Sequence, residues 1–315
     1  MLFSPAAMHI PDGLLSVIVS LLMWLLAFVV LGYALRKTGQ DLGERQIPLM
    51  GVMAAFIFAA QMINFPVAAG TSGHLLGGAL AAITLGPWAG MLTMVSVIIV
   101  QALLFQDGGL LVMGANVINM GVLTVLIGYG LYRGVSAQQN RLRLAATGIA
   151  AWLSVMAAAL ATSLELWLSG AARLDLVVPA MLGVHALIGL GEAAITVAAF
   201  AFILRTRPDL IDAARPVEGR GWGWVAAGLL LSLGVVLLAP LASAYPDGLE
   251  RVAIDLGFIG RSAGAPFHLL PDYTLPFLGE TSLSTILAGA FGALVVAAIA
   301  TLVIRLFRRA ESANA

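Results

Sequence analysis

The chain has 315 residues, of which 61% are hydrophobic and 10% are charged, and its mean hydropathy is +1.01. No water-soluble domain of this size needs so much apolar surface, so the composition indicates a protein that crosses a membrane several times. The sequence contains no cysteine, which excludes disulfides and thiolate metal sites, and its 16 basic and 16 acidic residues balance, which argues against nucleic acid as a partner.

The segment Met8-His9-Ile10-Pro11-Asp12-Gly13 precedes the first long apolar stretch. In a chain that starts at Met8, the free α-amine, the amide nitrogen of His9 and its Nδ1 could close two chelate rings around one metal. Planar nitrogen ligation of this kind is typical of Ni(II) or Cu(II). We therefore expect translation to start at Met8; cleavage of residues 1–7, or a site that works differently, are the alternatives. The alternative is an ordinary Pro-Asp-Gly turn in which Asp12 caps the following helix.

Nine apolar runs follow, and all are predicted to be helical because the alternating pattern of a membrane barrel is absent. They cover residues 14–35, 48–64, 75–86, 88–105, 111–132, 146–168, 179–204, 223–244 and 284–307. The third and fourth runs are short, and Gly86-Pro87 between them predicts a break between two helices.

The basic residues predict the orientation of these segments. With the N-terminus outside, the inner loops hold 13 of the 16 Lys and Arg residues, and only Arg173, Arg251 and Arg261 lie outside. The opposite topology would invert this ratio, contrary to the positive-inside rule. The N-terminus is therefore expected outside and the C-terminus in the cytoplasm.

A change of composition divides the chain. Residues 206–221 form a polar, proline-containing stretch that predicts a cytoplasmic linker. The fold class is therefore all-α: a polytopic helical membrane protein with a core of about seven helices over 8–205 and a C-terminal two-helix hairpin over 222–309. We expect the hairpin, with its long outer loop, to affect access to the metal without contributing a donor.

Several polar residues fall within or beside the apolar runs. His74 stands in a glycine-rich segment at the start of the third run, on the same expected outer side as Met8, and could supply a fourth nitrogen donor. His185 and Glu192 are two helical turns apart and share a face. They could act as gating groups, or simply form a hydrogen-bonded pair between helices. Asn116 and Asp12 are possible partners for the second N–H of a ligand imidazole.

The stretches MHIPDGLLS, GTSGHLLGGALAAITLGPWAG, MGANVINMG and HALIGLGEAAIT resemble the substrate-specific component of nickel/cobalt energy-coupling-factor transporters, the NikM/CbiM type, over roughly residues 8–205. YPDGLERVAIDLGF at 245–258 resembles the PDGLE motif of the small NikN-type accessory component. The whole chain therefore resembles a fusion of the two components.

The resemblance implies metal ligation by Met8, His9 and His74, with Ni(II) or Co(II) as the transported substrate. It also implies a multi-pass protein of the cytoplasmic membrane that works with a transmembrane coupling component and two cytoplasmic ATPases. The PDGLE motif favours nickel, and cobalt transport serving cobalamin biosynthesis is the alternative. The sequence itself has no P-loop, because its only lysine, Lys37, lacks the preceding glycine.

The residues alone are compatible with two other hypotheses about function. An apolar bundle could carry another small solute such as a vitamin, although the Met-His start would then be unexplained. An intramembrane enzyme could use His185 and Glu192, although no nucleophile or complete metal set accompanies them. Scattered methionines could suggest copper transport, but their spread over several runs favours packing.

Overall fold

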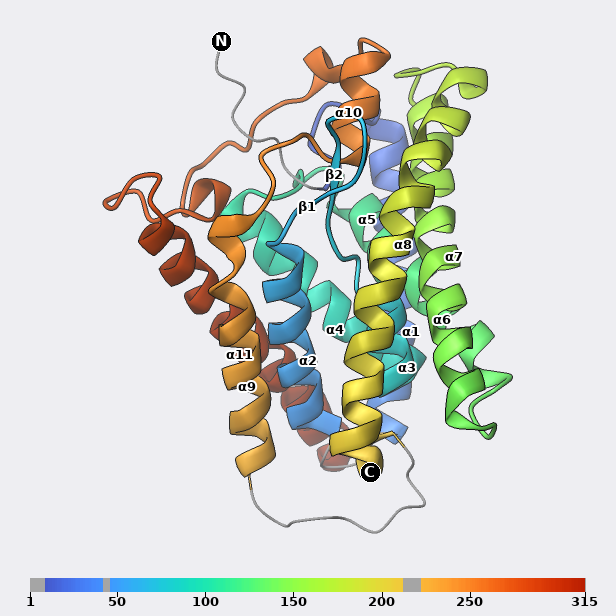
Figure 1. Ribbon diagram of the computed structural model, residues 1–315, viewed down its shortest axis with the longest axis vertical. Helices are drawn as coiled ribbons and strands as arrows, with labels where there is room; N and C mark the ends of the chain where they lie inside the picture. Colours follow the sequence, from blue (N-terminus) through green and yellow to red (C-terminus); the bar gives the residue numbers. More distant parts are fainter. Residues whose placement is uncertain (1–8, 42–45, 212–221, 315) are drawn as a thin grey trace.

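The computed structural model describes residues 9–41, 46–211 and 222–314, and it describes side chains within 9–39, 46–211 and 222–306. Within these ranges the chain is almost entirely helical (Figure 1). The α-helices are α1 (Val17–Asp41), α2 (Gln46–Gln61), α3 (Gly78–Leu85), α4 (Pro87–Val100), α5 (Met113–Asn116), α6 (Thr124–Arg133), α7 (Asn140–Leu168), α8 (Leu174–Thr206), α9 (Gly223–Val236), α10 (Gly248–Asp255) and α11 (Ser282–Asn314). Two π-helical segments, Gln101–Phe105 and Val117–Leu123, continue α4 and α5.

The prediction of a polytopic helical membrane protein is confirmed. Seven of the described helical stretches are long and apolar enough to cross a membrane. The α2 helix has 16 residues and α3 has only 8, so α3 is too short to cross alone at 1.5 Å per residue. The predicted break is also confirmed, because α3 ends at Leu85, α4 begins at Pro87, and Gly86 between them has a φ of +79°.

The start of the third apolar run was predicted wrongly. Helix α3 begins only at Gly78, so His74 lies in extended chain before it. The antiparallel pair β1 (Phe65–Pro66) and β2 (Ser72–Gly73) precedes this stretch, and Gly77 turns the chain with a φ of +83°. His74 is therefore presented on a non-helical segment inside the bundle. Such backbone is tolerated at membrane depth only where protein covers it.

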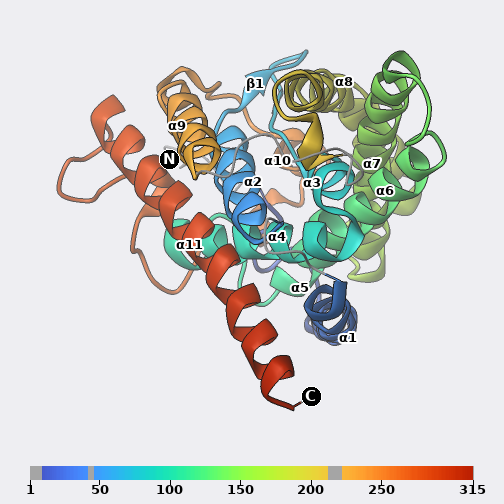
Figure 2. The same cartoon turned by 90° about the horizontal axis from the view of Figure 1, so that it is seen from below.

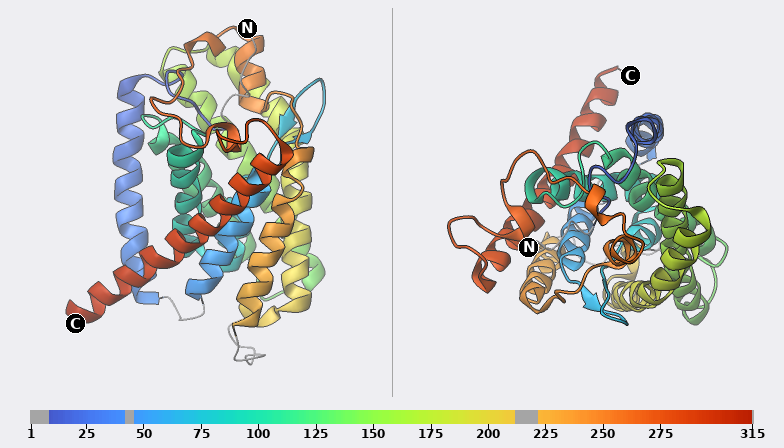
Figure 3. Two further views of the ribbon diagram at one scale, coloured as in Figure 1. Left: turned by 90° about the vertical axis from the view of Figure 1, so that its left-hand side faces the viewer. Right: turned by 90° about the horizontal axis from the view of Figure 1, so that it is seen from above.

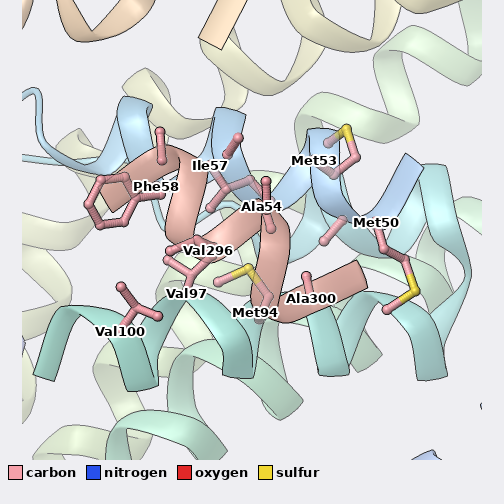
Figure 4. Packing of buried hydrophobic residues seen from close by; sticks show 14 of the residues in the cluster. Met50, Met53, Ala54, Ile57, Phe58, Met94, Val97, Val100, Val296 and Ala300 are labelled. Atoms are coloured by element: carbon pink, nitrogen blue, oxygen red, sulfur yellow. The ribbon is translucent and has the colours of Figure 1, made fainter. Parts of the chain in front are cut away.

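The core forms where α2, α4 and α11 meet. Figure 4 shows Met50, Ile57 and Phe58 of α2 facing Met94 and Val97 of α4 and Val296 of α11. The methionines interpreted as packing residues are buried, with exposed fractions of 6% or less. Seen from below, α2, α3 and α4 lie inside a ring formed by the other long helices (Figure 2). The C-terminal helices α9 and α11 thus belong to the packed body of the molecule.

The outward faces of the bundle remain apolar. On α1, Ile18 is 73% exposed and Phe28 is 65% exposed, and the same helix buries Ala27 and Ala34. An exposed apolar surface of this extent is expected where lipid tails replace water. Above the bundle, α10 and the long segment that follows it cover the upper end, together with β1 and β2 (Figure 3).

Candidate metal-binding site

The N-terminal segment enters the upper end of the bundle as extended chain and is held there by the loop after α4. The carboxylate of Asp12 accepts hydrogen bonds from the backbone N–H groups of Leu110, Leu111 and Val112 at 2.9–3.1 Å. The backbone of Asp12 also forms a β-bridge with Ala263 of the C-terminal region, whose N–H donates to the Asp12 carbonyl at 2.7 Å. Asp12 thus anchors the segment that carries His9.

Asn116 fixes the next residue along this segment. Its Oδ1 accepts from the Ile10 N–H and its Nδ2 donates to the Ile10 carbonyl, both at 3.1 Å. Asn116 therefore contacts the backbone beside His9, whereas the sequence suggested a contact with a ligand imidazole. This two-point amide contact leaves the Ile10 backbone little freedom to rotate.

His74 is positioned by Glu192 of α8. The two carboxylate oxygens of Glu192 accept from the N–H groups of Leu76 and Gly77 at 2.6 and 2.9 Å. These donors stand where α3 begins, so Glu192 caps the start of this short helix. The His74 Nδ1 lies 2.9 Å from the Leu75 carbonyl. Because a carbonyl can only accept, Nδ1 carries the proton and the Nε2 lone pair is the possible metal donor.

The structure brings His9 and His74 together although 64 residues separate them in the sequence. Their ring centroids are 5.6 Å apart and nearly perpendicular, and their exposed fractions are 2% and 7%. Both line a cavity of about 70 Å³. The other polar side chains around this cavity include Asn116, Asn119, Thr162, His185 and Asp247.

His185 and Glu192 make separate contacts, and only Glu192 forms hydrogen bonds to another segment of the bundle. The His185 Nδ1 donates to the Met181 carbonyl of its own helix at 2.8 Å, and its ring faces the cavity from α8. Glu192 is fully buried and is occupied by the backbone of Leu76 and Gly77. His185 therefore remains available as a cavity residue, whereas Glu192 supports the segment that carries His74.

Asp107 is a site residue that the sequence analysis did not single out. Its Oδ1 lies 3.3 Å from both the His9 backbone nitrogen and the His9 Nδ1, and its carbonyl oxygen lies 3.1 Å from the same Nδ1. Asp107 thus faces the two His9 nitrogens that a chelate would use. It stands in Gln106-Asp107-Gly108-Gly109, a sequence typical of an ordinary turn. The only sequence signal for a functional role was its position directly after an apolar run.

Asp247 belongs to the PDGLE motif of the outer loop, which was expected to affect access to the metal, but its place at the cavity was not predicted. It caps α10 by accepting from the Glu250 N–H at 2.7 Å, and its side chain lines the cavity. The preceding chain is tied down by Ser72, which donates to the Tyr245 carbonyl at 2.7 Å. Burial raises the pKa of Asp247 to about 7, against smaller opposing effects that include its interaction with His74. Residues 222–309, here called the C-terminal module, therefore place a carboxyl group at the proposed metal pocket.

Burial also controls the protonation of His9. The loss of solvent lowers the pKa of its imidazole, and the nearby Asp107 carboxylate opposes this effect only in part. A neutral imidazole is the form that binds transition metals. Within the described residues, no group of three His, Asp or Glu side chains is arranged to hold a metal by itself. Met8, the third proposed ligand, lies outside those residues.

Fold and site together define a helical membrane protein with a buried, imidazole-lined cavity near one end of its bundle. Residues 9–210 match the family described as the cobalt uptake substrate-specific transmembrane region, and residues 222–309 match the PDGLE domain. The chain belongs to the first family and carries a PDGLE domain after it.

Named relatives agree with this assignment. A chain of Archaeoglobus fulgidus with the provisional name fused nickel transport protein NikMN is 38% identical, over 96% of this chain and all of its own length. The fused nickel transport protein NikMN of Rhodobacter capsulatus is 30% identical over 93% of this chain and 96% of its own. The cobalt transport protein CbiM of Geobacter sulfurreducens is 33% identical over 78% of this chain and 75% of its own.

The fold also resembles that of solved transporters. A crystal structure of a truncated transition metal transporter has 35% sequence identity and a TM-score of 0.57, covering 62% of this chain and 98% of its own. A second crystal structure of a transition metal transporter has 34% identity and the same TM-score. Recognition of the family from the quoted motifs is thus confirmed.

Proposed function

We propose that this chain captures Ni(II), with Co(II) as the alternative, at the outer face of the cytoplasmic membrane and passes it inward. The observation that carries the proposal is the meeting of His9 and His74 at one small buried cavity. The proposed donors are the amine of Met8, the amide nitrogen and Nδ1 of His9, and the Nε2 of His74.

The size of the cavity favours an ion over an organic solute. At about 70 Å³ it holds a bare metal ion, whereas pockets that enclose drug-sized molecules measure about 300–1,000 Å³. The nitrogen donor set favours Ni(II) over magnesium or calcium, which prefer oxygen ligands. The hypothesis of an intramembrane enzyme loses its main support, because both carboxylate oxygens of Glu192 accept hydrogen bonds from the backbone at the start of α3.

Nickel is preferred to cobalt because the relatives that match nearly the whole chain carry nickel in their names. Relatives named for cobalt match a smaller share of it, 78% or less. Competition between Ni(II) and Co(II) for the purified chain, followed by uptake of each metal by cells, distinguishes the two substrates.

The energy source is proposed to lie outside this chain. We propose a binding core over 8–205, a cytoplasmic linker over 206–221 and an accessory hairpin over 222–309, working with a transmembrane coupling component and two ATPases. The sequence supports this assembly because it has no P-loop of its own. Uptake that continues in cells lacking any co-expressed ATPase would contradict it.

The donor set is tested by titrating Ni(II) into the purified full chain and its single substitutions. His9→Ala and His74→Ala each remove one planar donor and are expected to abolish measurable binding. His268→Ala is the matched control, because His268 is exposed in the C-terminal region. The intact mass of active protein tests the start at Met8. Active protein that keeps residues 2–7 would rule out the amine donor.

A further inference from the structure

Tyr273 of the C-terminal module is buried inside the bundle, with an exposed fraction of only 8%. It ends a short turn, Pro271–Tyr273, and both Asp272 and Tyr273 have positive φ values, +52° and +57°. Such values are uncommon and unfavourable for residues other than glycine. The backbone thus accepts an unfavourable conformation at the turn that carries this buried tyrosine.

The ring and the hydroxyl of Tyr273 make separate contacts. The ring stacks on Phe105 with centroids 4.7 Å apart and planes 15° apart. The hydroxyl donates to the Oδ2 of Asp107 at 2.5 Å and accepts from the Nε2 of Gln101 at 3.0 Å. Substitution by phenylalanine can therefore remove the polar contacts and keep the stacking.

Asp107 connects the hydroxyl of Tyr273 to His9. While its Oδ2 is bound by Tyr273, its Oδ1 accepts from the His9 N–H and lies 3.3 Å from the His9 Nδ1. A carboxylate held at one oxygen has a defined orientation at the other. The chain Gln101–Tyr273–Asp107–His9 thus runs through buried groups to two proposed donor atoms.

We propose that Tyr273 is a positioning residue of the metal site, which acts through Asp107 to hold the amide nitrogen and imidazole of His9 in place for metal capture. The inference rests on the proposed function and adds a role for the C-terminal module. The module supplies the group that orders the N-terminal donors, although it contributes no donor through this contact.

The test compares Tyr273→Phe with Tyr245→Phe in the purified full chain. Tyr245 is 56% exposed and lies in the same module, so it provides the same chemical change away from Asp107. Residues that orient metal ligands typically contribute about 10- to 100-fold in metal affinity. We expect Tyr273→Phe to weaken Ni(II) binding by about 10-fold and to alter the ligand-field absorption of the bound ion, with no change for Tyr245→Phe.

A double substitution separates positioning from general loss of structure. If Tyr273 acts through Asp107, then Tyr273→Phe combined with Asp107→Asn should bind Ni(II) as Asp107→Asn alone does. Additive losses, or a Tyr273→Phe chain with the affinity and spectrum of the wild type, would overturn the positioning role. A wild-type chain that fails to bind Ni(II) would instead refute the proposed function, and the inference with it.

Discussion

At the scale of single residues, the surroundings of His9 decide how the site responds to acid. Burial lowers the pKa of its imidazole below the ordinary value of 6.5, so the ring is neutral at pH 7 and gives up no proton when a metal binds. The α-amine has an ordinary pKa of about 7.7–8.0. The amine and the amide of the proposed chelate are therefore the groups that must lose protons.

We predict that Ni(II) affinity rises between pH 6 and 8 and that about two protons leave per ion at pH 7, from the amine and the amide. The sign follows because protons compete with the metal for these donors. Calorimetric titration in buffers of different ionisation enthalpy measures the number released. An affinity that stays constant over this range, with no proton released, would argue against both backbone donors.

The sequence identified His9 and His74 because a Met-His start and a glycine-flanked histidine are unusual beside membrane helices. It did not identify Asp107 or Tyr273, since each stands in a segment of ordinary turn or loop composition, and it identified the PDGLE motif without predicting that Asp247 lines the cavity. The Tyr273–Asp107 contact spans 166 positions and exists only because the C-terminal region packs across the upper end of the bundle. A single sequence carries no local signal for a contact of this kind.

At the scale of elements, irregular backbone surrounds the site. The π-helical segment Gln101–Phe105 leads into the loop of Asp107, and the segment Val117–Leu123 follows Asn116 directly. Such π-helical turns often occur at functional sites. The apolar runs predicted these helices but could not predict where an α-helix changes to a π-helix, because apolar residues occur in both. The start of α3 was missed because its cap, Glu192, comes from a distant helix.

Glu192 is predicted to stabilise the segment that carries His74. In Glu192→Ala the N–H groups of Leu76 and Gly77 lose their acceptors, which should cost about 1–3 kcal/mol of unfolding free energy. Glu192→Gln keeps one acceptor oxygen and should lose less. Thermal unfolding in detergent measures the change, with exposed Glu280→Gln as the control. An unchanged melting temperature in Glu192→Ala would contradict this supporting role.

At the scale of the whole molecule, the two ends of the bundle differ in their number of basic residues. The α6–α7 connection and the end of α8 lie at the lower end, and α10 and β2 lie at the upper end (Figure 1). Residues of α10 and β2 line the cavity, which therefore lies near the upper end. Most basic residues were assigned to the lower loops from the sequence alone, and under the positive-inside rule this assignment predicts that the cavity lies on the outer side. An ion arriving from outside would then meet the covering segments first and His9 and His74 beneath them.

This orientation can be tested cleanly because the chain has no cysteine of its own. Ser136 and Ser262 are exposed, the first between α6 and α7 and the second in the segment after α10. In intact cells, a membrane-impermeant maleimide should label Ser262→Cys but not Ser136→Cys, and both should react after permeabilisation. The same serine-to-cysteine change at the two ends makes each variant the control for the other. Labelling of Ser136→Cys alone would place the cavity on the cytoplasmic side and contradict the proposed capture of metal from outside.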